Sequence, residues 1–152
     1  FPSAIAYHGH GALATMKNGD HVLAAFNLKG VHRGTPMVAT LWMYNAVPEA
    51  LNLGLWLDVA DTTQHEVLAS VRPDESEVID GDWSMVEVPF VAGADDERIA
   101  LITHWTYWFD RPMIVDEILV RPTGCDVYRR DTATDGDEEL FYNGFWIRRP
   151  KP

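Results

Sequence analysis

The stretch that decides the fold runs from residue 51 to residue 60 and reads LNLGLWLDVA. Apolar residues occupy every second position. Successive side chains of a β-strand point to opposite faces, so this alternation predicts a strand with one face in the core. The core row is Leu51, Leu53, Leu55, Leu57 and Val59. The opposite face carries Asn52, Gly54, Trp56 and Asp58.

Other strand-like runs fill the rest of the chain, separated by short segments rich in Gly, Pro, Asp and Asn. This texture is typical of a β-sandwich or barrel. Besides residues 51–60, the predicted strands are Ala12–Met16, His21–Leu28, Met37–Tyr44, Glu66–Val71, Met85–Val91, Arg98–His104, Met113–Arg121, Asp126–Arg129 and Leu140–Arg148. We therefore expect residues 1–152 to form one all-β domain, a sandwich of roughly eight to ten antiparallel strands.

Charge and composition exclude several classes of partner. The formal net charge is −11, with 12 basic and 23 acidic residues, and no Lys/Arg cluster is present to displace counterions from nucleic acid. No apolar run approaches the ~20 residues that cross a bilayer, so we expect neither nucleic-acid binding nor membrane insertion. Cys125 is the single cysteine, which leaves no internal disulfide.

Aromatic side chains gather on the predicted outer faces of two strands. Trp42 and Tyr44 lie opposite the core row of residues 37–44, and Trp56 lies opposite the leucine row. If these strands are neighbours, the three rings lie together. Indole rings pack on the flat C–H faces of pyranoses, while amides and carboxylates bind the sugar hydroxyls. The predicted ligand-binding residues are Trp42, Tyr44, Trp56, Asn52, Asp58 and Glu87.

Three alternatives compete with an open sugar site. A loop or the C-terminal segment could cover the rings and form a second small core. The same aromatic face and the edge strands could instead join copies of an extracellular structural or adhesive subunit. Asp58 and Glu87 could form the carboxylate pair of a glycoside hydrolase or polysaccharide lyase. Because no recognised catalytic motif is present, we expect a binding protein and not an enzyme.

Four segments together resemble the galactose-binding-like jelly roll of carbohydrate-binding modules. They are Ala6-Tyr7-His8-Gly9 with Gly11-Ala12-Leu13, Leu41-Trp42-Met43-Tyr44, residues 82–90 (DWSMVEVPF) and residues 114–120 (IVDEILV). The resemblance covers residues 6–122 and leaves a C-terminal hairpin extension over residues 123–152, which would replace a shortened first strand or cover the aromatic face.

The resemblance implies a secreted or cell-surface domain that binds an oligo- or polysaccharide, as part of a larger parent protein or by self-association. In that family the aspartate matching Asp116 often contributes to a structural calcium site, so the resemblance implies calcium at this residue. The alternative is that Asp116 only binds backbone amides, because calcium needs six to eight oxygen ligands and no others can be named.

Overall fold

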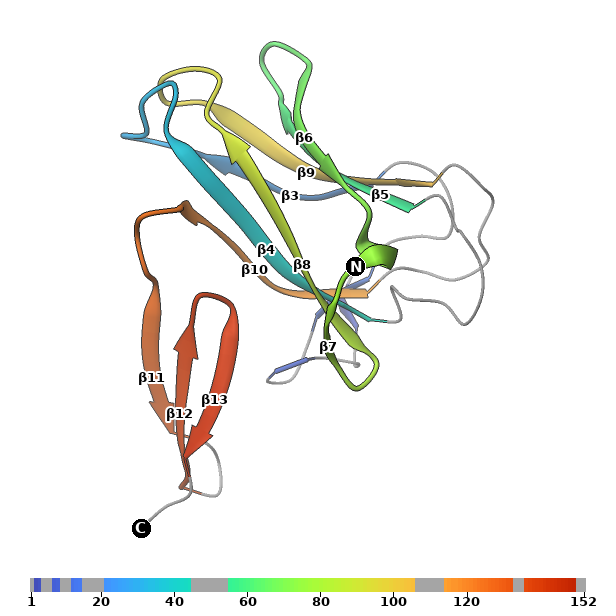
Figure 1. Cartoon of the computed structure of the whole chain (residues 1–152), viewed down its shortest axis with the longest axis vertical. Helices are drawn as coiled ribbons and strands as arrows, with labels where there is room; N and C mark the ends of the chain where they lie inside the picture. Colours follow the sequence, from blue (N-terminus) through green and yellow to red (C-terminus); the bar gives the residue numbers. More distant parts are fainter. Residues whose placement is uncertain are drawn as a thin grey trace.

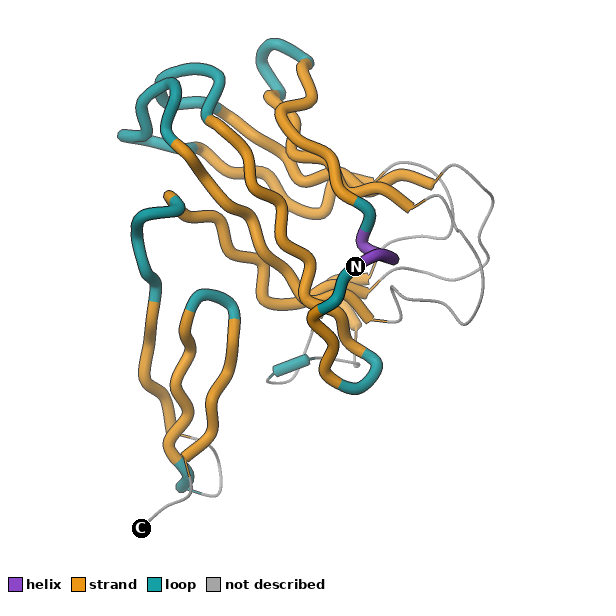
Figure 2. Tube along the Cα trace, viewed as in Figure 1, coloured by secondary structure: helices purple, strands orange, loops and turns teal. Residues whose placement is uncertain are grey.

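The computed structural model describes residues 2–3, 7–8, 12–14, 21–44, 55–105, 114–132 and 136–149. Within these ranges thirteen strands form three antiparallel sheets, which confirms the all-β sandwich predicted from the sequence (Figures 1 and 2). The remaining regular element there is a single-turn 3-10 helix, Pro73–Glu75. None of the described residues belongs to a helix long and apolar enough to cross a membrane.

Two of the sheets form the sandwich. The six-stranded sheet contains, in spatial order, β1 (Pro2–Ser3), β2 (Ala12–Ala14), β10 (Ile114–Pro122), β4 (Pro36–Tyr44), β8 (Trp83–Val91) and β7 (Val78–Asp80). The four-stranded sheet contains β3 (His21–Asn27), β9 (Arg98–Trp105), β5 (Leu55–Asp61) and β6 (Glu66–Val71). The C-terminal sheet contains β11 (Tyr128–Thr132), β12 (Glu138–Tyr142) and β13 (Phe145–Arg149).

The core lies between the six-stranded and four-stranded sheets. Leu57 and Val59 of β5 are fully buried there, as the leucine alternation predicts. They pack in one cluster with the inward row of β4, which is Met37, Ala39, Leu41 and Met43. Leu51, Leu53 and the side chain of Leu55 lie outside what the structure describes. The alternation therefore assigns faces correctly wherever it can be checked on these two strands.

The prediction of one strand over Leu140–Arg148 is wrong, because these residues form a hairpin. Tyr142 of β12 pairs with Phe145 of β13, which leaves Asn143 and Gly144 as a two-residue turn. Both turn residues have positive φ, 48° and 97°. Positive φ at both central positions is the requirement of a type I′ hairpin turn, and Asn-Gly is the pair that meets it most readily.

Candidate functional site

Trp42 points away from the core, as predicted, but it is not open to solvent. Its exposed fraction is 2%. The ring of Tyr7 stacks on it at 4.0 Å and 14°, and Phe145 packs against it edge-on. The indole Nε1–H donates to the carbonyl oxygen of Gly144 at 2.8 Å. The N-terminal segment and the β12–β13 turn therefore cover this ring, so it belongs to a second small core and cannot stack on a sugar.

Tyr44 belongs to the same enclosed cluster. It is partly buried and packs with Trp83, which also contacts Tyr7. Tyr7 Oη donates to Asp80 Oδ2 at 2.9 Å, and burial together with this bond raises the pKa of Tyr7 above its usual range. Tyr7 thus ties residues near the start of the chain to the β7–β8 hairpin and helps to close the outer face of the six-stranded sheet.

Trp56 does not lie beside Trp42 and Tyr44. We expected the three rings to lie together if their strands were neighbours, but β4 belongs to the six-stranded sheet and β5 to the four-stranded sheet. Both strands turn their tryptophan away from the shared core. The two tryptophans are therefore on opposite sides of the sandwich, and one ligand cannot touch both.

Trp56 lies instead in a polar and aromatic row on the outside of the four-stranded sheet. It pairs across the strands with His104, whose ring is nearly parallel to the indole (13°) at a centroid distance of 6.4 Å. On the β6 side, the guanidinium of Arg72 lies 5.6 Å from the indole centroid. Trp56 is only partly buried.

Asp58 provides the next row of this surface. Its Oδ2 lies 3.0 Å from His104 Nε2, and its Oδ1 accepts a hydrogen bond from Ser70 Oγ. The side chains of Asp58 and His104 keep 14% and 34% of their surface exposed. We call the surface formed by Trp56, Asp58, Ser70, Arg72 and His104 the Trp56 face.

The predicted ligand-binding residues therefore fall into two groups: Trp42 and Tyr44 lie together in the enclosed cluster, and Trp56 and Asp58 lie together on the partly exposed Trp56 face. Glu87 is exposed on β8, opposite Thr40 and on the outside of the six-stranded sheet. Glu87 and Arg72 both line a shallow cavity of about 290 Å³. Asn52 lies outside the described residues. Because Asp58 and Glu87 occupy different outer faces, the carboxylate pair of a glycosidase is not formed by these two residues.

His104 and Arg72 were not predicted. The alternation of residues 98–104 could have placed His104 on an outer face, but it could not tell which strand would lie beside it. Arg72 directly follows the last residue of β6, which pairs with Leu57. Its position beside Trp56 depends on that register, which sequence alone does not provide.

Asp116 binds backbone amides. Its Oδ2 accepts from the N–H groups of Tyr7 (2.9 Å) and His8 (3.1 Å), and its Oδ1 accepts from the N–H of Glu117 (2.8 Å). This is the structural role considered as the alternative to a metal ligand. Within the described ranges, no three His, Cys, Asp or Glu side chains are grouped to hold a metal ion. Calcium at Asp116 stays a prediction.

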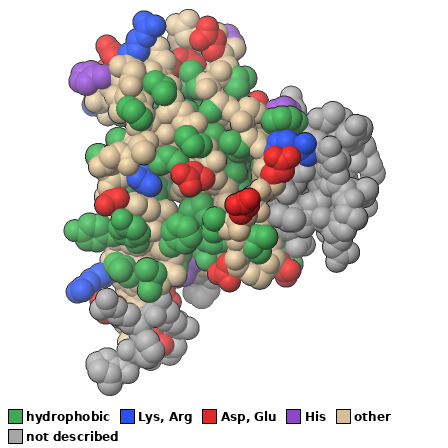
Figure 3. Space-filling model, viewed as in Figure 1, with side chains coloured by type: hydrophobic (Ala, Val, Ile, Leu, Met, Phe, Trp, Pro, Cys, Tyr) green, Lys and Arg blue, Asp and Glu red, His purple; other side chains and the backbone are tan. Residues whose placement is uncertain are grey.

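The C-terminal sheet presents an exposed apolar face. Cross-strand pairing places Tyr128, Tyr142 and Phe145 in one row, and Leu140 and Ile147 in the next row of the same face. Four of these side chains are between 40% and 71% exposed. In the space-filling view, hydrophobic side chains gather over this part of the molecule (Figure 3). The other face carries Phe141 and Trp146, with Arg129 over both rings and His8 stacked on Trp146.

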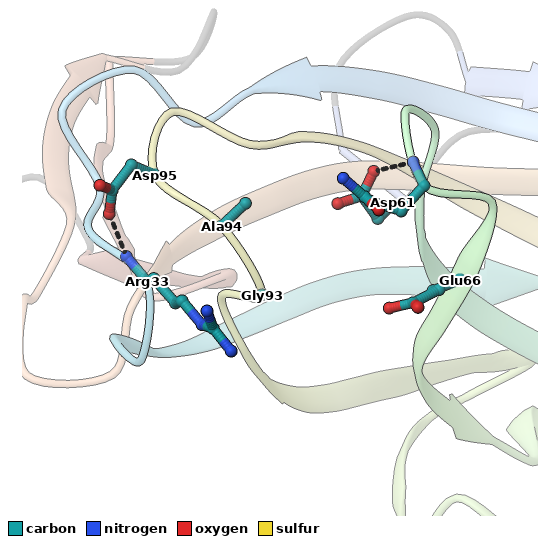
Figure 4. Close-up of a pocket in the computed structure, with 7 residues that line it drawn as sticks. Arg33, Asp61, Glu66, Gly93, Ala94 and Asp95 are labelled. Atoms are coloured by element: carbon teal, nitrogen blue, oxygen red, sulfur yellow. Dashed lines mark hydrogen bonds between the residues drawn. The ribbon is translucent and has the colours of Figure 1, made fainter.

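A polar cavity of about 480 Å³ opens at one end of the sandwich, between the β3–β4, β5–β6 and β8–β9 connections. Asp61 and Glu66 lie on one side of it, and Arg33 and Asp95 lie on the other (Figure 4). Beside it, Asp61 and Glu97 are both 97% buried, each being 3% exposed. Burial and the neighbouring Asp61 carboxyl raise the pKa of Glu97 to about 7, while hydrogen bonds lower the pKa of Asp61.

No protein-family model matches the sequence, and no curated protein matches it.

Proposed function

We propose that this protein binds carbohydrate without catalysing a reaction, and that the Trp56 face is the binding surface. The observation that carries the proposal is the row of His104, Trp56 and Arg72 beside the hydrogen-bonded Asp58. Sugar recognition needs a flat apolar surface for the C–H face of the ring and fixed polar groups for its hydroxyls. Ligand sites in general combine apolar or aromatic walls with a few placed polar groups.

The polar groups of the Trp56 face are held in position before any ligand arrives. Asp58 is held in position by two contacts, one with His104 and one with Ser70. An ionised carboxylate offers about four acceptor positions, so these two contacts leave Asp58 with capacity for a sugar hydroxyl. The guanidinium of Arg72 lies over the indole ring and is held there by Glu75, whose Oε1 lies 3.6 Å from Arg72 Nη1. It places a positive charge on this surface, which suits a sugar carboxylate. Prior positioning lowers the entropy cost of binding.

The all-β sandwich is compatible with the jelly roll of galactose-binding-like modules, which supports this proposal at the level of fold. On the same basis we place the protein outside the cell or on its surface, attached to a larger parent protein or associated with further copies. The proposal differs from the sequence prediction in its site, because Trp42 and Tyr44 belong to the enclosed cluster on the other sheet.

The test compares two aromatic variants after a glycan array has identified a bound sugar. Trp56→Ala removes the central ring, and we expect at least a tenfold loss of affinity, about 1.4 kcal/mol or more. Tyr128→Ala is the matched control, since it removes an exposed aromatic ring from the C-terminal sheet. Circular dichroism checks that both variants fold. Loss of binding in Tyr128→Ala with normal binding in Trp56→Ala would place the site on the C-terminal sheet instead.

A second candidate function is self-association as a structural or adhesive subunit, and the exposed face of the C-terminal sheet favours it. Tyr128 is 71% exposed and Ile147 is 49% exposed. Contiguous apolar and aromatic patches on a surface often mark interfaces. If this face joins copies, the mass measured by light scattering should rise with concentration, and Tyr128→Ser with Ile147→Ser should return it to that of the monomer. A constant monomer mass in the unmodified protein would exclude this candidate.

A further inference from the structure

Two carboxyl groups are buried side by side at the loop end of the sandwich. Asp61 is the last residue of β5, and Glu97 directly precedes β9. Each residue keeps only 3% of its surface exposed, and the two side chains share a hydrogen bond. An ionised carboxylate can only accept hydrogen bonds, so a bond between two carboxyl groups requires a proton on one of them. The pair therefore holds one proton for its two acids.

The proton belongs to Glu97. Asp61 Oδ1 accepts from the N–H groups of Thr63 (2.7 Å) and Gln64 (2.8 Å). The bond from Glu97, together with these backbone donors, lowers the pKa of Asp61. Burial, and next the bond with Asp61, raise the pKa of Glu97 to about 7. Glu97 Oε2 is buried and finds no donor among the described residues, which fits an oxygen that carries the proton itself.

No cation replaces this proton within the described part of the chain, where the arginine ion pairs include neither acid. The charged groups around the pair are Glu66 on β6, His65 in the β5–β6 turn, and Arg33 and Asp95 on the opposite side of the polar cavity (Figure 4). The charge of Glu66 adds to burial in raising the pKa of Glu97. The positive charge of a protonated His65 adds to the hydrogen bonds that lower the pKa of Asp61. Both neighbours therefore favour a proton on Glu97.

The bond between the two acids joins segments that are far apart in the chain. Asp61 leads into the β5–β6 turn, and Glu97 ends the β8–β9 connection. Two backbone hydrogen bonds lie beside it. The N–H of Thr62 donates to the carbonyl of Arg98 at 3.0 Å, and the N–H of Leu28 donates to the carbonyl of Glu97 at 2.8 Å. The shared proton therefore lies where the β5–β6 turn, the β8–β9 connection and the end of β3 meet.

We propose that Asp61 and Glu97 form a proton-dependent latch, in which one shared proton holds the β5–β6 turn against the β8–β9 connection. Loss of this proton leaves two ionised carboxylates side by side in a buried site, which is costly without a counter-charge. Opening toward the polar cavity relieves this cost, because Asp61 already lines that cavity. The latch is independent of carbohydrate binding, since the Trp56 face contains neither acid.

Closure of the latch takes up a proton. The pKa of Glu97 is about 7 in the folded chain, against an ordinary value of 4.5. The closed latch therefore binds one proton more than the open latch between these values, and it loses stability as pH rises from about 4.5 to about 7. The lowered pKa of Asp61 adds a pH dependence only below its ordinary value of 3.8. One proton per opening weakens closure about tenfold per pH unit.

The test is hydrogen exchange of the intact chain from about pH 5 to about pH 8, corrected for the intrinsic exchange rate. The amides of Thr62 and Leu28 report opening, because they bond across the latch. Their protection should fall by nearly tenfold per pH unit from about pH 5 to about pH 6.5, and level off above about pH 7.5. Constant protection over this range would overturn the proposal.

Variants assign the response to Glu97. Glu97→Gln keeps the shape of the side chain and provides an amide donor for Asp61, but it cannot titrate, so protection of the same two amides should stay constant. Glu117→Gln is the matched control. It removes another carboxyl group with a raised pKa, on β10 of the other sheet, and should leave the fall in protection unchanged. The same fall in Glu97→Gln as in the unmodified protein would refute the latch.

A second measurement needs no variant and holds even if Glu97→Gln does not fold. Carbon-13 NMR of the unmodified chain follows each side-chain carboxyl group through its titration. The Glu97 carboxyl should titrate with a midpoint near pH 7. A midpoint near the ordinary value of 4.5 would show that no proton is retained between the two acids, and the proposal would fail.

Discussion

Trp42 and Trp56 both point away from the core of the sandwich, but Trp42 is buried whereas Trp56 is only partly buried. Trp42 is enclosed by Tyr7, Phe145 and the carbonyl of Gly144. Its replacement by alanine removes a large buried ring and should lower the free energy of unfolding by about 3–5 kcal/mol. Trp56→Ala should cost clearly less stability, because the ring is partly exposed. Urea denaturation of both variants checks this, and equal losses would contradict the described burial.

Glu117 offers a pH test at the scale of one residue. It lies in the bulge of β10, and its φ is 54°. Burial, and next the charge of Asp116, raise its pKa above the ordinary value of 4.5. The folded chain therefore keeps a proton that the unfolded chain has released, and this contribution to stability falls as pH rises above about 4.5.

Glu117→Gln removes this titration while keeping the size of the side chain. The unmodified protein should lose stability relative to the variant when urea midpoints are compared from about pH 4.5 to pH 7. If the difference between the urea midpoints of the two proteins stayed constant over that range, the carboxyl of Glu117 would titrate at the same pH in the folded and unfolded chains.

At the scale of elements, the β12–β13 turn holds the C-terminal sheet against the six-stranded sheet. A Cβ on Gly144 would lie 2.6 Å from Met85 Cε and 3.1 Å from Thr40 Oγ1, and the φ of Gly144 is 97°. Gly144→Ala should therefore cost about 2–4 kcal/mol, from backbone strain together with the clash. Thermal and urea unfolding measure the cost.

Gly81 provides the matched control in the β7–β8 turn. It also has positive φ, 60°, but a Cβ there would meet no atom within 4 Å. Gly81→Ala should cost about 1 kcal/mol from backbone strain alone. If the two variants lost equal stability, the contact of residue 144 with Thr40 and Met85 would contribute nothing measurable.

Strand patterns in the sequence predicted most elements, because alternation depends only on neighbours along the chain. The inward rows of β4 and β5 show this. The alternation could not show that β4 and β5 belong to different sheets, since pairing joins residues far apart in sequence. It also could not show what covers an outward tryptophan. The hairpin at Asn143-Gly144 could have been predicted from its turn residues, but the apolar run around them concealed it.

At the scale of the whole molecule, the C-terminal sheet extends away from the sandwich and meets the six-stranded sheet at its β12–β13 turn (Figure 1). A chain that ends at Pro122 loses this sheet and uncovers Trp42. We expect it to unfold at lower urea concentration and to bind more of the dye ANS than the full chain does. Equal stability and equal dye binding would show that the C-terminal sheet does not protect the aromatic cluster.

The most direct test of the central claim is a glycan array probed with the unmodified protein and with Trp56→Ala. The account predicts that the unmodified protein binds a defined set of glycans, and that a folded Trp56→Ala variant loses them. A blank array from the folded, unmodified protein, or an unchanged set of glycans with Trp56→Ala, would contradict carbohydrate binding through the Trp56 face.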